Sequence, residues 1–302
     1  MAEHITIAIP TFRRPKNLQR LLDAIARLDG DADIRVLVAD NDAEGQDGIK
    51  LCARLAPDYR WPLRAVVARQ RGIAQVRNTL FAEALADCHT GFIAMIDDDE
   101  WPAPDWISEF LRTQRQTGAN ALQGAILFAA ERGGSQTRPD IRSQPGVTML
   151  ESAGNLFIAR AMLRAMSSPW FDPAFALTGG EDRDFFLRLE AEGACFAWAD
   201  GARVYGDVPD GRATLGWTLK RAYSNGNSDM QVLLKYRPGP ATRLREAGKI
   251  AAALLLSLPL AVILSPSPNR RLAPLTKLFR AAGKLTAMAG WRYNEYAVVH
   301  GE

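Results

Sequence analysis

The sequence predicts an α/β fold, in which a mainly parallel sheet is flanked by helices, followed by a helical region at the C-terminus. Near-continuous apolar runs alternate with amphipathic segments over the first 100 residues, and acidic clusters follow two of these runs. Beyond residue 234 the chain becomes strongly basic and apolar. With 302 residues and 47% hydrophobic side chains, the chain can bury one full core and carry an additional region.

The first third has the pattern of a Rossmann-like nucleotide-binding half. Apolar, β-branched runs predict strands at residues 4–9, 34–40, 63–67 and 92–96, and amphipathic patterns predict helices at 15–28 and 72–85. In such sheets ligands bind outside the carboxyl ends of the strands. Asp40 and the acidic triplet at residues 97–99 fall at those ends.

The middle of the chain predicts a mixed extension of the sheet. We expect a strand at 119–128, a strand passing into a helix at 154–163, a helix at 181–193, and short strands at 195–200 and 202–207. This half would supply the acceptor side of a cleft. The predicted domains are residues 1–234 and residues 235–302.

Several classes of protein lose support. No G-x-G-x-x-G follows the first strand and no P-loop motif occurs, so a divalent metal on carboxylates is the alternative means of holding phosphates. The three cysteines and three histidines match neither a disulfide framework nor a zinc spacing, which favours a reducing compartment. The N-terminus enters a strand pattern without a recognisable signal peptide, which favours the cytoplasm.

The acidic triplet is the first candidate site. Consecutive aspartates are more often a solvated charge run, but these follow a strand directly. Because side chains alternate along an extended chain, Asp97 and Asp99 are expected on one side and Asp98 on the other. Two carboxylates on one side can hold a cation that neutralises a diphosphate.

Three further positions have both a functional and a structural interpretation. Asp40 could bind a base or ribose, or it could form a turn. Arg77 lies near a helix N-terminus suited to anions, although exposed arginines are common on helices. Glu181 and Asp182 follow two glycines and could project into a cleft, or they could cap the next helix.

The C-terminal region predicts membrane association. Residues 235–292 hold eleven Lys/Arg against Glu246 alone, a net charge of +10. Residues 250–264 lack charge, but as a helix they reach only about 22 Å and contain Pro259, which favours partial insertion over a span of about 30 Å. Residues 274–293 form a basic amphipathic pattern suited to an anionic membrane surface, with a buried core or dimer helix as the alternative. Nucleic acid is not expected, because the charges flank an apolar segment.

Together, the segments IAIPTFRRP, VLVADND, RGIAQVRN, MIDDDEWP, SAGNLFIAR and LTGGEDRDFFLR resemble family 2 inverting glycosyltransferases of the GT-A fold, especially bacterial exopolysaccharide enzymes. The resemblance covers about residues 4–225. It implies a metal-dependent hexosyltransferase that uses Mn²⁺ or Mg²⁺. The chain departs from the family pattern at Phe12-Arg13-Arg14, where tyrosine-asparagine is frequent.

The resemblance also implies residue roles. Asp99 and Asp97 match the D-x-D motif and would hold the metal, Asp182 matches the catalytic base, and Glu181 would bind the acceptor or act as the alternative base. The expected nucleotide-sugar-binding residues are Pro10, Thr11, Arg13, Asp40, Asp42, Arg77, Asp97, Asp98, Asn155, Arg212, Trp217 and Arg221.

The expected donor is a nucleoside diphosphate sugar, with UDP as the favoured nucleotide. The expected acceptor is an oligosaccharide on polyprenyl diphosphate at the cytoplasmic face of the bacterial inner membrane. A polyprenyl-phosphate glycosyltransferase, a non-catalytic sugar-nucleotide-binding membrane scaffold and a nucleotidyltransferase are the alternatives.

Overall fold

The computed structural model describes residues 3–30, 32–129, 135–137, 149–207, 214–265 and 267–295. The chain forms two compact units. The first, the sheet unit, comprises residues up to 176 together with residues 181–208. The second, the helical unit, comprises residues 177–180 and residues from 209 onward.

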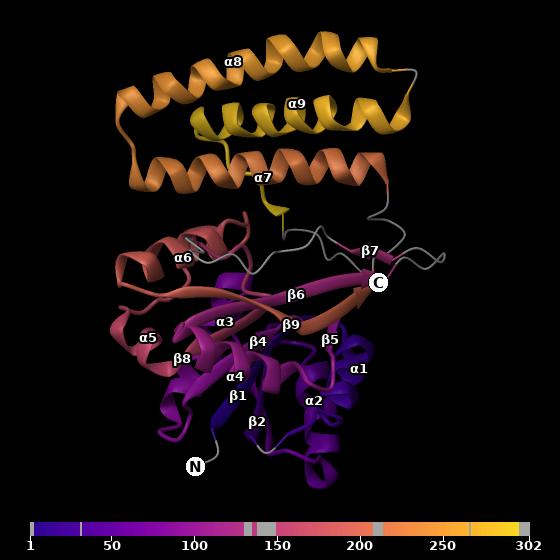
Figure 1. Cartoon of the computed structure of the whole chain (residues 1–302), viewed down its shortest axis with the longest axis vertical. Coiled ribbons are helices and arrows are strands. Elements are labelled where there is room, and N and C mark those ends of the chain that lie inside the picture. The colour runs from indigo at the N-terminus through magenta and orange to yellow at the C-terminus, as the bar shows by residue number, and fades with distance from the viewer. Residues whose placement is uncertain are drawn as a thin grey trace. The chain divides into compact units, whose positions relative to one another are not determined.

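The sheet unit is a mixed sheet with helices on both faces (Figure 1). Its strand order is β3-β2-β1-β4-β8-β6-β9-β5, with β7 paired to β6. Strands β3, β2, β1 and β4 are parallel, and β8 is antiparallel to both of its neighbours. The strands are β1 (His4–Thr11), β2 (Asp33–Asp40), β3 (Leu63–Val67), β4 (Phe92–Ile96), β5 (Glu100–Pro102), β6 (Ala121–Ala129), β7 (Ser135–Thr137), β8 (Asn155–Ala159) and β9 (Phe196–Asp207).

Two hydrophobic layers hold the helices to the sheet. Alternation along β1 sends Ile5, Ile7 and Ile9 to one face and Ala8 to the other. Helices α1, α2 and α4 cover the first face, and α3, α5 and α6 cover the second. The helices of this unit are α1 (Pro15–Ile25), α2 (Asp47–Leu55), α3 (Ile73–Ala86), α4 (Trp106–Thr117), α5 (Arg160–Ala165) and α6 (Glu181–Ala191).

The predicted α/β fold class is confirmed, with local differences. The predicted strands at 63–67 and 92–96 match β3 and β4. The two short strands predicted at 195–200 and 202–207 are one strand, β9, which accommodates the break through a register shift against β6. A short strand, β5, follows the acidic triplet and pairs with β9, where the sequence predicted only the end of a strand.

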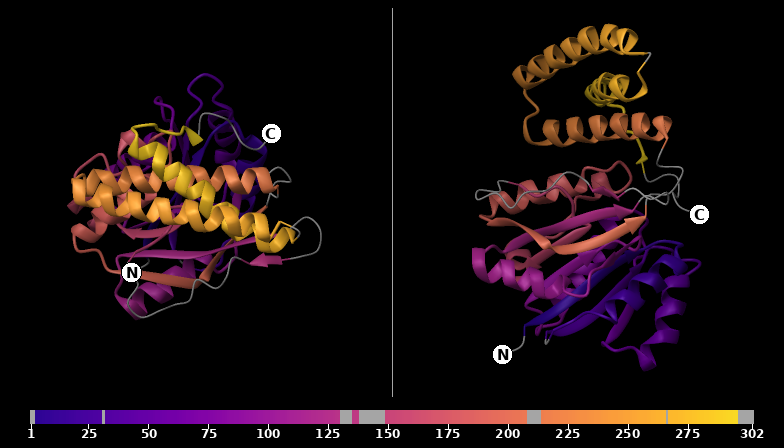
Figure 2. Two further views of the ribbon diagram at one scale, coloured as in Figure 1. Left: turned by 90° about the horizontal axis from the view of Figure 1, so that it is seen from above. Right: turned by 45° about the vertical axis from the view of Figure 1, so that its right-hand side comes forward.

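The helical unit consists of α7 (Leu215–Tyr236), α8 (Pro240–Ile263) and α9 (Pro268–Met288), with α9 packed against both of the others (Figures 1 and 2). Close backbone approach joins α7 to α9, since a Cβ on Gly283 would lie 2.0 Å from the Tyr223 carbonyl oxygen. A Cβ on Gly226 would lie equally close to the Arg280 carbonyl. The buried Asn227 donates to the Gly283 and Trp291 carbonyls, so small residues and a polar network fix this pair.

Helix α8 is longer than the apolar segment predicted from the sequence. Its 24 residues correspond to about 36 Å, so length and composition allow it to cross a membrane. It continues through Pro259 without interruption. Only 22% of its most apolar window is buried.

The boundary between the units differs from the predicted one. The sequence placed it between residues 234 and 235, where the charge changes, but all of α7 belongs to the helical unit. The physical reason is packing, since Asn227 and Met230 on α7 are buried against α9 and its neighbours.

We expect Gly283→Ala to destabilise the α7–α9 pair by about 1–3 kcal/mol, because the added methyl group cannot fit against the Tyr223 backbone. Gly248→Ala on α8 is the matched control, since a Cβ there meets open space and should stabilise by about 0.5–1 kcal/mol. Amide hydrogen exchange measured in α7 and α9 would compare the two. Equal protection in both variants would contradict the tight contact.

Candidate active site

The candidate site lies where the carboxyl ends of β1, β2 and β4 meet the start of β8. Thr11 pairs with Asp40 across β1 and β2, and Ile96 pairs with Asn155 across β4 and β8. The acidic triplet therefore follows β4 beside the segment before β8. A Cβ on Gly154 would lie 3.1 Å from an Asp97 oxygen, so a glycine keeps space at that carboxylate.

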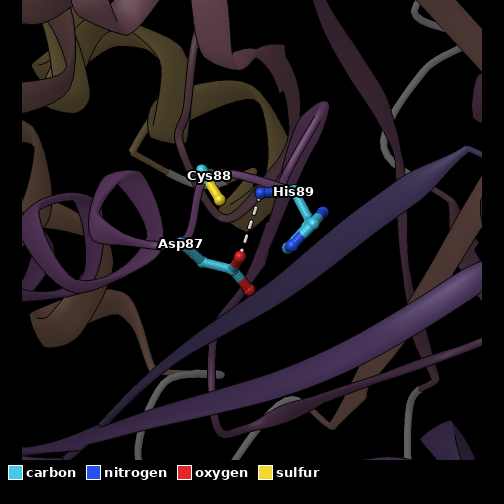
Figure 3. A group of neighbouring side chains, drawn as sticks. All are labelled: Asp87, Cys88 and His89. Atoms are coloured by element: carbon cyan, nitrogen blue, oxygen red, sulfur yellow. Dashed lines mark hydrogen bonds between the residues drawn. The ribbon is translucent and has the colours of Figure 1, made fainter.

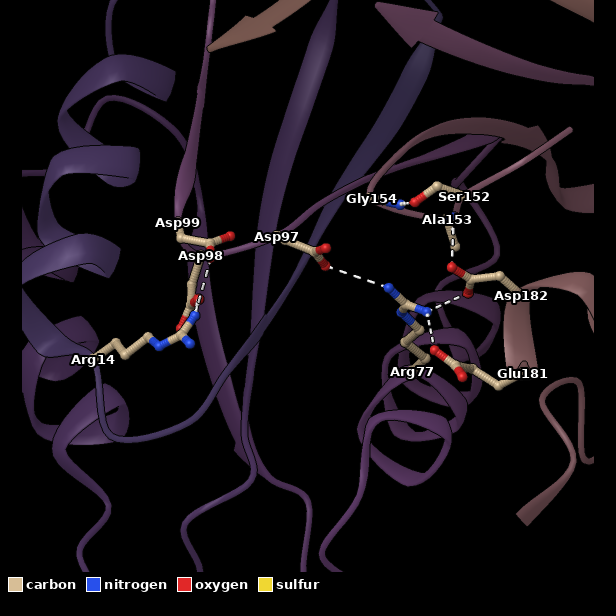
Figure 4. Close-up of polar contacts among 10 residues, drawn as sticks. All are labelled: Arg14, Arg77, Asp97, Asp98, Asp99, Ser152, Ala153, Gly154, Glu181 and Asp182. Carbon is tan, nitrogen blue, oxygen red and sulfur yellow. Dashed lines mark hydrogen bonds and ion pairs between the residues drawn. The ribbon is translucent and has the colours of Figure 1, made fainter. Parts of the chain in front are cut away.

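The three aspartates of the triplet contact two arginines (Figure 4). Asp98 is buried and accepts hydrogen bonds from the Thr11 hydroxyl at 2.8 Å and from Arg14 at 3.1 Å. Asp99 lies 3.3 Å from the same Arg14 nitrogen, whereas Asp97 points toward Arg77. The side chains of Asp97 and Asp99 each remain 33% exposed, so these two are the carboxylates accessible to a cation.

Arg77 connects the acidic triplet to Glu181 and Asp182 (Figure 4). Its side chain comes from α3 and is only 4% exposed. One terminal nitrogen donates to Glu181 at 3.1 Å and to Asp182, and the other lies 3.5 Å from Asp97. Asp97 and Asp182, 85 positions apart in the chain, therefore contact one guanidinium.

Negative charge exceeds positive charge in this cluster. Six carboxyl groups, at residues 97–100, 181 and 182, surround the guanidinium groups of Arg14 and Arg77. Burial raises the pKa of Asp98 to about 7, although Arg14 and Thr11 oppose the shift. Burial also raises the pKa of Asp97 and of Glu100, and neighbouring carboxylates add to the effect.

A divalent cation fits this arrangement. It would relieve the excess negative charge, and carboxylate oxygens are the ligands that Mg²⁺ and Mn²⁺ prefer. Asp97 and Asp99 are the residues that could hold it.

Asp182 is positioned by three elements. Gly179 and Gly180 both have positive φ and bring the chain into α6, which begins at Glu181. The Asp182 carboxylate accepts the Arg77 guanidinium on one oxygen and the Ala153 backbone N–H, at 3.2 Å, on the other. Its side chain is 20% exposed, and each oxygen retains a lone pair for a further donor.

Two predicted ligand-binding residues make hydrogen bonds that support the fold. Asp40 is buried and its oxygens accept backbone N–H groups of Asp42 and Gly48, so it secures the start of α2. Burial raises its pKa despite these hydrogen bonds. Asn155 is fully buried, donates to the carbonyls of Ala125 and Ala202 and accepts from Trp106. Their contacts with a nucleotide-sugar stay predictions.

Other predicted residues lie at or near the same strand ends. Pro10 is buried at the end of β1. Arg13, which is half exposed, donates to Asp42 at 2.8 Å, and this hydrogen bond holds the pKa of Asp42 below its usual range. Their nucleotide contacts stay predictions.

Two further predicted residues lie in the helical unit. Trp217 and Arg221 lie on α7 in the helical unit, where Arg221 donates to Glu295 at 3.3 Å. Arg212 lies outside the described residues. The expectation that these three bind the nucleotide-sugar stays a prediction.

Several groups at or near the candidate site were not predicted from the sequence. Arg14, which joins Asp98 to Asp99, was visible only as the second arginine after the first strand. The Ala153 backbone N–H leaves no signal in the sequence. The Phe12 ring lies about 5 Å from the cationic carbons of both Arg13 and Arg71. It occupies the position where tyrosine is frequent.

A second cluster of ligand-type side chains lies at the other end of the strands, just before β4 begins. Asp87, Cys88 and His89, in the loop before β4, place one ligand-type atom each within 4.8 Å of one another (Figure 3). Asp87 already accepts the His89 backbone N–H and pairs with Arg35, so it has a structural role in this loop. The sequence spacing did not predict this cluster.

Comparison with known proteins identifies the class. The mannosyltransferase PcManGT of Pyrobaculum calidifontis, solved with GDP-Man and Mn²⁺, has a TM-score of 0.61 at 17% identity, covering 95% of this chain and 88% of that one. S. aureus TarS (1-349) has a TM-score of 0.54 at 16% identity, covering 97% and 93%. The fold is therefore the GT-A fold of glycosyltransferases.

The sequence comparisons show the family. The profile described as Glycosyl transferase family 2 matches residues 6–168. The succinoglycan biosynthesis protein ExoM of Rhizobium meliloti (strain 1021) is 31% identical over 299 residues, which cover 95% of this chain and 93% of ExoM. The chondroitin synthase of Escherichia coli is 24% identical, covering 88% of this chain and 42% of that protein. The chain belongs to glycosyl transferase family 2.

We expect Arg77→Met to lower the free energy of unfolding by about 3–5 kcal/mol, because it leaves the Glu181 and Asp182 carboxylates without their shared cation. The double variant Arg77→Met/Glu181→Gln should recover part of this loss. Arg64→Met is the control, since its pair with Glu83 is exposed and should contribute less than about 1 kcal/mol. Urea denaturation would measure these variants and Glu181→Gln alone, and a loss in the double variant equal to the sum of the two single losses would argue against a shared cluster.

Proposed function

We propose that the protein transfers a hexose from a nucleoside diphosphate sugar, with UDP as the favoured nucleotide, to an oligosaccharide on polyprenyl diphosphate during bacterial exopolysaccharide synthesis. The observation that carries the proposal is the contact of Asp97 and Asp182 with the single guanidinium of Arg77. Likeness to ExoM supports the exopolysaccharide role. The solved complexes of TarS with UDP-GlcNAc and of PcManGT with GDP-Man support a nucleotide-sugar donor.

In this proposal the reaction inverts the anomeric carbon. Asp182 takes the proton of the acceptor hydroxyl while that oxygen forms its bond to the anomeric carbon. The bond from the anomeric carbon to the diphosphate oxygen breaks at the same time, and the nucleoside diphosphate leaves. Arg77 and Ala153 are positioning groups, since each holds Asp182 through a hydrogen bond.

The leaving diphosphate carries negative charge that must be stabilised. Asp97 and Asp99 would hold Mn²⁺ or Mg²⁺, which when bound neutralises the diphosphate. Arg14, which donates to both Asp98 and Asp99, keeps the triplet in place.

We place the enzyme at the cytoplasmic face of the bacterial inner membrane. Helix α8 exposes large apolar side chains, including Leu255 and Ile263 at 74% and 70%, and the surrounding region is basic. An anionic membrane surface matches both features. Docking there would concentrate the enzyme where a lipid-linked acceptor lies.

We expect Asp182→Asn to lower kcat by about 10²- to 10⁴-fold with little change in donor binding, because the base is lost while the amide keeps the shape. Glu190→Gln is the matched control, since Glu190 is exposed on the same helix. The assay measures product and nucleoside diphosphate release from UDP-, GDP- and TDP-sugars with lipid-linked acceptors. Chelation should abolish turnover, and added Mn²⁺ or Mg²⁺ should restore it.

The alternatives give different outcomes. Donor binding without turnover, unaffected by Asp182→Asn, would indicate a non-catalytic scaffold. Transfer to polyprenyl phosphate alone would indicate a phosphate-acceptor glycosyltransferase.

A further inference from the structure

Helices α8 and α9 enclose a groove in the helical unit. Its volume is about 600 Å³, which falls within the range of small-molecule sites. Leu256 and Leu260 on α8 line it and remain 71% and 45% exposed. Four cationic side chains also line it, namely Lys249, Lys277, Arg280 and Lys284. The groove therefore combines apolar and basic walls.

The charges of the groove are not balanced by the protein. Lys249 and Lys284 share the carboxylate of Glu246, at 2.7 and 3.3 Å, and Arg280 pairs with Asp229. Among the described residues, Lys277 has no ion-pair partner. Only two carboxylates pair with these four cations, and that of Glu246 is also shared with Arg245, so the groove keeps an excess of positive charge and matches a multiply charged anion.

The shape of the groove selects its ligand. Leu255 is exposed on α8 outside the groove, where a bilayer surface can contact it, whereas the groove volume suits a segment of one lipid chain. A phosphodiester phospholipid carries one negative charge at its phosphate, whereas a diphosphate diester carries two.

We propose that this groove binds a lipid diphosphate, with its chain along Leu256 and Leu260 and its two phosphate charges against the four cations. The inference rests on the proposed function, in which the acceptor is linked to polyprenyl diphosphate. It adds a dedicated site for the lipid end of that acceptor, formed only by residues of α8 and α9.

The test is vesicle binding by the full-length protein without donor sugar or metal. Phosphatidylcholine vesicles carrying a sugar-linked polyprenyl diphosphate, which is a diphosphate diester, are compared with vesicles carrying phosphatidylglycerol at equal surface charge. We expect the wild type to prefer the diphosphate vesicles. Lys277→Glu and Leu256→Glu should each weaken binding to them by roughly 10- to 30-fold, because each adds a negative charge inside the groove.

Matched controls separate the groove from the general surface. Arg270→Glu changes an exposed cation of α9 outside the groove, and Leu255→Glu changes the neighbouring exposed leucine of α8. Both should keep the preference. Equal binding of the two vesicle types by the wild type, or equal losses in all four variants, would overturn the proposal.

Two further measurements are competition by inorganic pyrophosphate and vesicle binding by Asp182→Asn. Inorganic pyrophosphate should not displace the vesicles at the concentration at which the lipid diphosphate does. Displacement at equal concentration would mean a phosphate site without lipid recognition and would overturn the proposal. Asp182→Asn should bind vesicles like the wild type. Loss of the vesicle preference would therefore contradict the groove alone, and loss of transfer activity would not.

Discussion

The candidate active site depends on one buried cation. Arg77 sits at 4% exposure and contacts carboxylates that follow β4 and that open α6. Burying a guanidinium is costly unless it is paired, and burying carboxylates is costly unless they are neutralised. Each group therefore stabilises the others, and this mutual requirement sets where Asp97 and Asp182 lie.

The surrounding fold makes this pairing possible. Parallel strands bring Thr11, Asp40 and the acidic triplet to one edge of the sheet, and the antiparallel β8 adds the 152–154 segment there. Asp40 and Asn155 use their polar groups to hold this edge together. At these strand ends, some buried polar residues support the fold and others belong to the charged cluster.

The helical unit is stabilised by different interactions. Close contacts at Gly226 and Gly283 and the hydrogen bonds of Asn227 join α7 to α9, while α8 keeps most of its apolar window exposed. This combination of small residues, internal polar pairing and exposed leucines agrees with the membrane association proposed above. It also leaves room for a groove with unbalanced positive charge between α8 and α9.

The sequence by itself determined the parallel strands, the acidic triplet at a strand end and the glycine-led acidic pair, because periodicity and turn chemistry are local properties. The tertiary structure alone decided which of these polar groups face one another. Asp40 and Asn155 hydrogen-bond to the protein at the strand ends, Arg14 and Ala153 contact the acidic residues of the site, and α7 lies in the helical unit. The reason is physical: the partner of a buried polar group is chosen by long-range packing, which a linear pattern does not encode.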